Sequence, residues 1–459
     1  MKHRWLPLAA AVFAVAATLV SAGTATANYE RPPACAEPNS PEPPQQTPAT
    51  LTTVGQAYYC IFDNYFSGPV LDSRDLLVPA FAALTQELQR RGLDQPDATL
   101  PALTGRKDPD WRAFSKVYQR IANALPNDEA RGAIAAAAIQ AMVDELDDNH
   151  ARWQNKSSQN LVGLTLSAIV GPGDIDPVAT QPVYVDRIAV DGPAAVAGVA
   201  LGDELLAING VPLFINGVFT KGALSWLMDA PLGSVVELTM RRPTTGETFT
   251  ASVTAARFQA PRPAVESRLV DGNIAYVTLP GFTPATADQV LAAVAALRAQ
   301  TGLRGVILDL RGNGGGSPAA VAKLLGALAH GKTTSYWCDV RDRCTPNRTD
   351  DSVELWNLPF VALTDRRCAS ACDSFTSSVK DLKLGKLVGT RTAGAVSGPG
   401  APYLLDNGTV LVLPKHHEIG ANKEVVNTVG VAPDHHAPMT AADLAAGRDP
   451  GLDKAVSLF

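Results

Sequence analysis

Two strand–turn–helix junctions in the C-terminal half constrain the fold most. The segment GVILDLRGNGGG (305–316) has the pattern of a buried strand that ends in a glycine-rich turn, and a helix pattern begins near Pro318. The segment VALTDRRCASACDSF (361–375) repeats this order with an apolar strand, small residues and a helix. Strand patterns at 273–279, 305–310, 360–363 and 410–413 alternate with helix patterns at 285–300, 318–329 and 371–382. This alternation predicts an α/β domain over residues 258–459, with helices covering a sheet.

The residues before this domain divide into two parts. Residues 51–156 predict a helical domain, because RGAIAAAAIQAMVDEL (131–146) keeps its larger apolar side chains near one helix face. After residue 160 the apolar period changes to two, with strand patterns at 161–169, 183–188 and 235–241. We therefore expect a multidomain α/β chain with a helical N-terminal region and a β-rich module over residues 157–257.

The N-terminus has the pattern of a secretory signal. Basic residues near the start precede an apolar run from 6 to 20, and ATA (25–27) fits a signal-peptidase site. We expect residues 1–27 to be removed and residues 28–50 to form a Pro-rich linker. The alternative is a retained membrane anchor, for which the run is short. No later stretch approaches about 20 apolar residues, so we expect no membrane span after signal removal.

The net charge of the chain indicates which partners it can bind. Removing residues 1–27 takes away two basic and no acidic side chains, which moves the formal charge from −6 to −8. Such a chain lacks a broad basic surface, so nucleic acid is not expected as the main partner. We expect an extracellular protein, either free or associated with the cell wall.

The even number of cysteines favours disulfides in an exported chain. The six cysteines allow 15 pairings, and the sequence alone does not choose among them. Sequence proximity suggests Cys35–Cys60, Cys338–Cys344 and Cys368–Cys372, of which the last would close a small loop around Ser370. The alternative is buried free thiols. The spacings do not fit a structural zinc site.

Each junction can carry chemistry. Backbone N–H groups in the glycine-rich turn can stabilise a developing negative charge. A dinucleotide fingerprint fits poorly, because Ser317 stands where its third glycine would be. A purely structural turn is the other alternative. At the second junction Ser370 can present its hydroxyl above the sheet, although a serine there can also simply cap the helix.

The β-rich module resembles a PDZ domain. The segment GVALGDELLAING (198–210) carries this resemblance together with GLTL (163–166). The resemblance implies that the backbone N–H groups of Gly163, Leu164, Thr165 and Leu166 hold the C-terminal carboxylate of a peptide, which pairs with an adjacent strand edge. The alternative is a module that only spaces the other domains.

Taken in order, the helical region, the PDZ-like module, DLRGNGGG (309–316) and the strand–Ser–helix element resemble the C-terminal processing (tail-specific) and tricorn-core serine peptidases. Members commonly show S-A-S-A-S-E where this chain has CASACD (368–373). The resemblance implies a catalytic domain of crotonase-like type, Ser370 as nucleophile, and backbone oxyanion donors at Ala371 and Gly315.

The resemblance also bears on the general base. Tail-specific members use a lysine in a G-x-x-T-x-G-K stretch, but this chain has GTRTAGA (389–395), with Ala395 at the lysine position. Tricorn-like members use a histidine just before the PDZ module, and His150 stands there. An imidazole can take the Ser370 proton and return it to the leaving amine.

The residues that assist the base depart from the family pattern. Tricorn-like members have a serine before the histidine and a glutamate shortly before G-V-x-P-D. Here Asn149 precedes His150, and Asn427 stands at the glutamate position before GVAPD (430–434). An amide can still orient an imidazole. Glu424 and Asp148 are alternatives for this role.

Two other patterns receive less weight. SSVK (377–380) fits S-x-x-K but lies inside a predicted helix without companion motifs. Adjacent histidines at 416–417 and 435–436 would point to opposite faces of a strand, so we expect no metal or other cofactor. The sequence thus predicts a secreted serine endopeptidase that hydrolyses flexible polypeptides. The alternatives are an inactive peptide-binding scaffold of this fold and a serine hydrolase of non-peptide esters.

Overall fold

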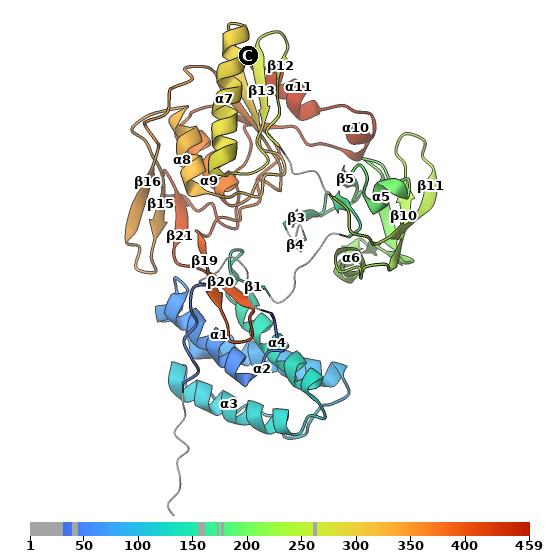
Figure 1. The fold of residues 1–459 in the computed structure, drawn as a ribbon, viewed down its shortest axis with the longest axis vertical. Coiled ribbons are helices and arrows are strands. Elements are labelled where there is room, and N and C mark those ends of the chain that lie inside the picture. Colours follow the sequence, from blue (N-terminus) through green and yellow to red (C-terminus); the bar gives the residue numbers. More distant parts are fainter. Residues whose placement is uncertain (1–30, 39–44, 155–160, 172–173, 176–178, 260–263) are drawn as a thin grey trace, which may run out of the picture.

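The computed structural model describes residues 31–38, 45–154, 161–171, 174–175, 179–259 and 264–459. It contains a helical domain, a β-rich module and an α/β domain, which occupy separate regions of Figure 1. The predicted signal sequence lies outside the described residues, as does part of the predicted linker. Within the described ranges, no helix is both long enough and apolar enough to cross a membrane.

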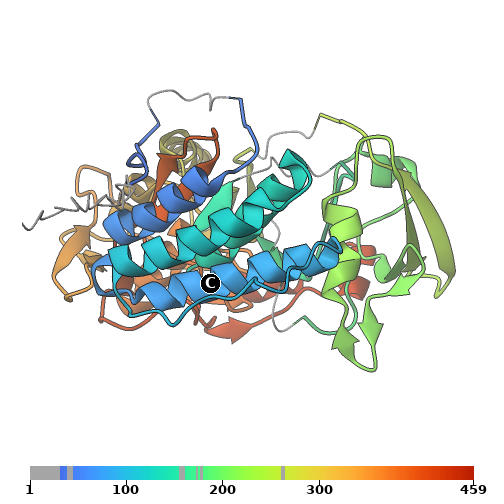
Figure 2. The same ribbon diagram turned by 90° about the horizontal axis from the view of Figure 1, so that it is seen from below.

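The helical domain is built from α1 (Leu51–Asn64), α2 (Ser73–Arg90), α3 (Lys107–Asn123) and α4 (Asp128–Asp144), which run across the face seen in Figure 2. Helix α4 contains most of the predicted helix at 131–146. It begins three residues earlier, because the Asn127 side chain accepts a hydrogen bond from the Ala130 N–H and caps it. The apolar faces of the four helices share one core.

The β-rich module has its own core. Its main sheet has the order β11-β10-β6-β7, and a separate pair joins β2 to β5. The strands are β2 (Leu164–Leu166), β5 (Val185–Ile188), β6 (Glu204–Ile208), β7 (Val211–Pro212), β10 (Val235–Arg241) and β11 (Thr248–Thr254), with helices α5 (Pro193–Val196) and α6 (Lys221–Met228). The single strand predicted over 161–169 is interrupted after Leu166, and β3 (Ile169–Gly171) follows.

The α/β domain contains a six-stranded sheet with the order β12-β13-β14-β17-β18-β22. Only β12 runs antiparallel to its neighbour. The strands are β12 (Ser267–Val270), β13 (Ile274–Thr278), β14 (Gly305–Asp309), β17 (Phe360–Thr364), β18 (Lys386–Gly389) and β22 (His435–His436). Every residue of β14 and β17 is buried, because helices cover both faces of the sheet.

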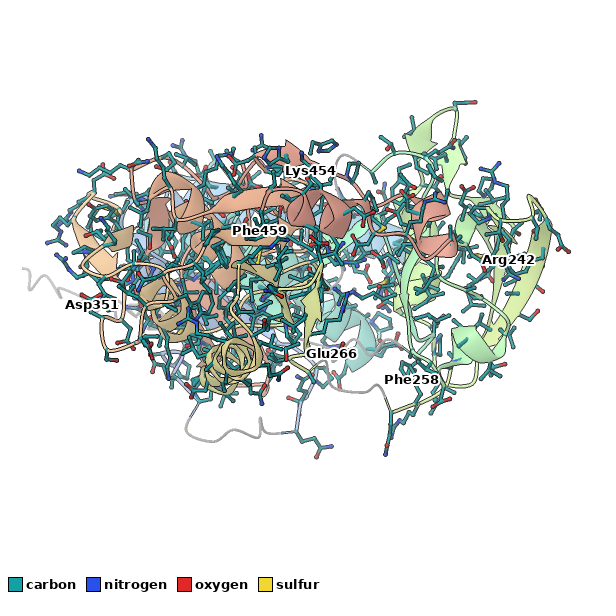
Figure 3. All side chains as sticks on the ribbon, turned by 90° about the horizontal axis from the view of Figure 1, so that it is seen from above. Arg242, Phe258, Glu266, Asp351, Lys454 and Phe459 are labelled. Atoms are coloured by element: carbon teal, nitrogen blue, oxygen red, sulfur yellow. A yellow bond between two sulfur atoms is a disulfide. The ribbon has the colours of Figure 1, made fainter. Side chains whose placement is uncertain are left out.

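One face of this sheet is covered by α7 (Pro284–Gln300), α8 (Pro318–Gly326) and α9 (Ala371–Asp381). Helix α11 (Pro450–Val456) covers the other face. Beside α9 lies a smaller sheet of β16 (Cys344–Arg348), β15 (Thr333–Cys338) and β21 (His417–Gly420). Arg242 of the β-rich module and Asp351 of the α/β domain lie on opposite sides of the view in Figure 3.

One hairpin departs from the linear domain division. Strands β19 (Gly400–Leu404) and β20 (Val410–Pro414) do not join the main sheet but pair with β1 (Arg152–Gln154). Their inward side chains complete the core of the helical domain. The sequence predicts one α/β domain over 258–459, whereas this hairpin packs with the helical domain. The difference was not visible in the sequence, because a strand pairing between segments more than 250 residues apart leaves no local pattern.

The three disulfides suggested by proximity are formed: Cys35–Cys60, Cys338–Cys344 and Cys368–Cys372. The first ties the described part of the predicted linker to α1. The same segment also contacts the hairpin, where Leu404 N–H donates to the Ala36 carbonyl at 2.7 Å.

The β1–β20 junction is expected to contribute strongly to stability. Trp153 on β1 is 6% exposed, and its Nε1 donates to Thr409 Oγ1 at 2.8 Å. Trp153→Ala should lower the free energy of unfolding by about 3–5 kcal/mol. Denaturant unfolding followed by circular dichroism measures this change. Trp226→Ala is the matched control, because Trp226 is 44% exposed, and its cost should be much smaller. Equal losses in the two variants would contradict the assignment.

Candidate active site

Ser370 stands where the strand–turn–helix pattern places it, between β17 and α9. Its backbone has φ +58° and ψ −120°, a strained conformation for a residue with a side chain. The Asp365 carboxylate holds the turn by accepting from the N–H groups of Gly312 (2.9 Å), Arg367 (3.0 Å) and Cys368 (3.1 Å). The disulfide between the buried Cys368 and Cys372 brackets Ser370 as well.

The glycine-rich turn after β14 packs directly against the Ser370 turn. Asn313 is fully buried, and its backbone carbonyl accepts from the Ala369 N–H at 3.0 Å. Gly315 has φ +100°, and a Cβ there would lie 2.6 Å from the Ser370 Cβ. Only glycine fits such an approach. Because β14 and β17 are adjacent and parallel, their carboxyl ends bring both turns to one edge of the sheet.

His150 reaches Ser370 from the helical domain. Its Nε2 lies 3.0 Å from Ser370 Oγ, although the two residues are 220 positions apart. Asp148 fixes the backbone there, since its Oδ1 accepts from the His150 N–H at 2.9 Å and from Ser397 Oγ at 2.6 Å. The structure therefore brings together the two residues that the sequence singled out as nucleophile and base.

A chain of amides sets the tautomer of His150. The Val396 N–H can only donate, so Asn427 Oδ1, 2.9 Å away, is the acceptor. Asn427 Oδ1 also faces Asn149 Nδ2 at 2.9 Å, and Asn149 Nδ2 donates to the Gly394 carbonyl at 3.2 Å. Asn149 Oδ1 is thereby turned toward His150 Nδ1 at 2.8 Å.

Two groups face His150 Nδ1: Asn149 Oδ1, which can only accept, at 2.8 Å, and the Ser397 N–H, which can only donate, at 3.4 Å. The shorter contact favours Nδ1 as the protonated nitrogen. Nε2 is then the lone-pair nitrogen, and the Ser370 hydroxyl donates to it. Burial lowers the pKa of His150 below its usual value near 6.5. The Asp148 carboxylate opposes that shift, and the Arg152 charge adds to it. The base is therefore neutral, and able to accept a proton, at neutral pH.

The structure shows which of the candidate residues orients the His150 ring. Asn149 contacts the imidazole directly, and Asn427 acts on it through Asn149. Asp148 holds the backbone of His150 rather than its ring. Glu424 lies elsewhere, next to Ser377 Oγ at 3.3 Å and beside Asp381. Burial and the Glu424 carboxylate raise the pKa of Asp381 to about 7.

The two proposed oxyanion donors have different surroundings. Ala371 is the first residue of α9, and it lines a cavity beside Ser370. The Gly315 N–H instead donates to Asn313 Oδ1 at 2.8 Å, so it must give up or share that bond to serve an oxyanion. Gly316 lines the same cavity as Ala371, which makes it a further candidate donor that the sequence analysis did not name.

Asp373 is a positioning residue for which the sequence patterns predicted no role. Its carboxylate accepts from the N–H groups of Ser370 (3.1 Å), Gly394 (3.0 Å) and Ala395 (2.9 Å). It thereby ties the nucleophile to the segment whose Gly394 carbonyl holds Asn149. Burial raises its pKa to about 6. Its position, three residues after Ser370 at a helix start, is that of a capping box and could have identified it.

The S-x-x-K pattern and the histidine pairs show no sign of a second catalytic site in the described residues. Ser377, Ser378 and Lys380 lie inside α9, as expected, and Ser378 Oγ donates to the Ser374 carbonyl at 2.7 Å. Across the described residues, no three His, Cys, Asp or Glu side chains are grouped so that they could hold a metal ion.

The predicted carboxylate loop lies partly in β2. Leu164 and Leu166 point their side chains into the core of the β-rich module, and Gly163 has φ +79°. Arg367, three residues before Ser370, donates to the Leu166 carbonyl at 2.5 Å and to the Ile169 carbonyl at 2.8 Å. The β-rich module therefore contacts the segment that carries the nucleophile.

Comparisons with known proteins agree with this architecture. Residues 273–437 match peptidase family S41, and residues 184–242 match a PDZ domain. The chain is 22% identical over 333 residues to the carboxy-terminal processing protease CtpA of Bacillus subtilis, covering 72% of this chain and 70% of that protein. It is 29% identical over 280 residues to tricorn protease homolog 1 of Streptomyces coelicolor, covering 58% of this chain and 25% of that protein.

Solved structures show the same fold. The photosystem II D1 C-terminal processing protease superposes with a TM-score of 0.53 and 21% identity, covering 88% of this chain and 95% of that one. By contrast, the chain spans only about a quarter of the length of the Streptomyces tricorn relatives that it matches.

The amide chain can be tested through the pKa of His150. Asn427→Asp keeps an oxygen acceptor for Val396 and Asn149 but adds a negative charge, so it should raise the pKa of His150 by about one unit. Histidine-ring NMR titration measures the shift, with His150→Gln to assign the signal. Asn407→Asp, at a buried asparagine in the β19–β20 loop, is the control for a new carboxylate outside the chain of amides. An unchanged His150 pKa in Asn427→Asp would refute the coupling.

Proposed function

From the peptidase family S41 domain that this chain contains, joined to a PDZ domain, we propose that the protein is a serine endopeptidase that cleaves flexible polypeptides. The observation that carries the proposal is the 3.0 Å contact between Ser370 Oγ and His150 Nε2, with Nδ1 held as a donor by Asn149. A serine with its hydroxyl proton directed at a neutral imidazole is the arrangement that nucleophilic acyl transfer needs.

The reaction follows from this geometry. Ser370 Oγ attacks the scissile carbonyl carbon while its proton passes to His150 Nε2. The carbonyl oxygen becomes an oxyanion, which the Ala371 N–H and an N–H of the 315–316 turn stabilise. The intermediate collapses as the imidazolium gives its proton to the leaving amine, and an acyl-enzyme on Ser370 remains. Water then attacks the ester with His150 as base, which releases the acid and restores the serine.

The charge around the imidazolium distinguishes this site from a Ser-His-Asp triad. The atom that faces Nδ1 is an amide oxygen, which orients the ring but stabilises imidazolium less than a carboxylate would. The Asp148 carboxylate raises the pKa of His150, but burial lowers it by more. We therefore propose that His150 stays neutral below its usual pKa near 6.5. The activity of the enzyme should then fall only at a correspondingly lower pH.

We also propose that the protein acts after export. The signal-like N-terminus and the three disulfides support this, because disulfides persist in oxidising compartments. The PDZ match and the GLTL segment (163–166) support the docking of substrates by their C-termini. Contacts from Arg367 to the backbone of residues 166 and 169 place that segment next to the nucleophile turn.

Covalent labelling tests the catalytic assignment. A fluorophosphonate should modify Ser370 of the mature protein, and Ser370→Ala should abolish both labelling and cleavage of an unstructured protein. His150→Ala should reduce labelling by a factor of about 10² to 10⁴, the usual contribution of a general base. Mass spectrometry of the modified peptide measures the first effect, and gel assays measure the second.

Ser457→Ala serves as the serine control, because Ser457 is exposed after α11 and its Oγ donates to the Lys454 carbonyl at 2.7 Å. This variant should still be labelled on Ser370. A folded wild type that takes up no label would favour the inactive scaffold, for which Ala395 and Asn427 are the motivating departures.

Substrate docking by a free C-terminus is tested with paired peptides. A peptide that ends in a carboxylate should bind Ser370→Ala protein at least about tenfold more tightly than the same peptide with a C-terminal amide, because only the carboxylate can accept the loop N–H groups. Fluorescence anisotropy measures both affinities. Equal affinities would exclude carboxylate capture by this loop.

A further inference from the structure

A cavity of about 280 Å³ opens directly beside Ser370. Ser370, Ala371, Ser374 and Ser378 of the nucleophile turn and α9 form one wall, and Trp337 of β15 and Glu418 of β21 lie on another. Because Ser370 lines this cavity, a peptide carbonyl that Ser370 attacks lies against it. The side chain on the acyl side of the scissile bond, called P1, can therefore enter it.

Glu418 lies about one helical turn from the nucleophile. Ser374 follows Ser370 on the same face of α9, a rise of about 5.4 Å. Ser374 Oγ donates to Glu418 Oε1 at 2.6 Å, and Trp337 Nε1 donates to Oε2 at 3.0 Å. Two neutral donors thus hold the carboxylate in place in the wall of the cavity.

The charge of Glu418 has no cationic partner within the described part of the chain. Its hydrogen-bond donors are the neutral groups of Ser374, Trp337 and Ser335, and burial raises its pKa. Glu418 is partly buried, and a partly buried carboxylate without a counter-ion carries a desolvation cost that a cation alongside it offsets. Apolar groups of the same cavity, from Val321 and Ala322, can pack against an aliphatic stem.

Arg348 lines the same cavity but differs from Glu418 in position. Its side chain is exposed on β16, and within the described residues it forms no ion pair with Glu418. Solvent screens its charge, whereas water reaches Glu418 less, so the carboxylate has the stronger effect on a bound side chain.

We infer that this cavity is the S1 pocket and that Glu418 makes the enzyme select lysine or arginine at P1. The ammonium or guanidinium lies against the Glu418 carboxylate, and the methylene stem lies along the apolar wall. This inference rests on the proposed peptidase function and names the substrate class of the same site.

The test uses peptides that differ only at P1: lysine, arginine, norleucine and glutamate. The wild type should cleave the two basic peptides with kcat/KM at least about tenfold above the norleucine peptide, since a desolvated charge pair is worth that much or more. In Glu418→Gln the ratio of lysine to norleucine should fall close to one. Glu266→Gln, an exposed glutamate on the same domain (Figure 3), is the matched control and should keep the wild-type ratio.

A second measurement does not depend on peptide turnover. Benzamidine, a small aromatic cation, should slow fluorophosphonate labelling of the wild type and of Glu266→Gln, and it should lose this effect in Glu418→Gln. Labelling of Glu418→Gln at Ser370 shows that its active site is folded. If benzamidine does not slow that labelling, the result supports the inference.

The outcomes separate this inference from the proposed function. A wild type that cleaves norleucine as well as lysine overturns the inference but leaves the peptidase in place. A preference for glutamate at P1 overturns it as well and points to Arg348. A basic preference that persists in Glu418→Gln assigns the selectivity to another residue. Absence of both labelling and cleavage in the folded wild type instead refutes the proposed function, and the inference falls with it.

Discussion

The hydrogen bond from the Val396 N–H to Asn427 Oδ1 determines which groups around His150 donate hydrogen bonds and which accept them. A backbone N–H has no alternative role, so it fixes which way the Asn427 amide faces. Asn149 must then present its amide nitrogen to Asn427 and its oxygen to His150. The lone pair of Nε2 is left for Ser370. A polar chain with one donor fixed by the backbone thus replaces the carboxylate that sets the tautomer in a Ser-His-Asp triad.

This chain of amides depends on packing between segments that are distant in the sequence. His150 comes from the helical domain, Ser370 from the α/β sheet, and Asn427 from the segment after β21. The β1–β20 pairing holds the first against the second, since β1 begins two residues after His150. Asp373 holds Ser370 to the segment at residues 394 and 395. Loss of either contact would separate atoms that must lie within about 3 Å for proton transfer.

Much of the fold could be predicted because it depends on local patterns. Strands β13, β14 and β17 of the main sheet and helices α7, α8 and α9 follow from apolar runs, capping residues and glycine turns, and their bounds agree within a few residues. The other strands of that sheet, β12, β18 and β22, were not predicted. The pairing of Ser370 with His150 was predicted only through a family resemblance, since a single histidine carries little information by itself. The strand predicted at 410–413 was assigned to the α/β domain, but it packs in the core of the helical domain. A strand partner more than 250 residues away leaves no periodicity to detect.

The sequence alone determined the types of groups available: a serine at a strand–helix junction, a histidine before the PDZ-like module, and amides at positions 149 and 427. Local chemistry sets these features, because turn, cap and strand preferences act over a few residues. Only the tertiary structure decided that Asn149 rather than Glu424 or Asp148 touches the imidazole. It also showed that the Gly315 N–H is already bonded and that Glu418 faces the cavity beside Ser370. Contacts and burial of this kind arise when distant segments pack together, and the free energy of a buried charge depends on that surrounding rather than on its neighbours in the chain.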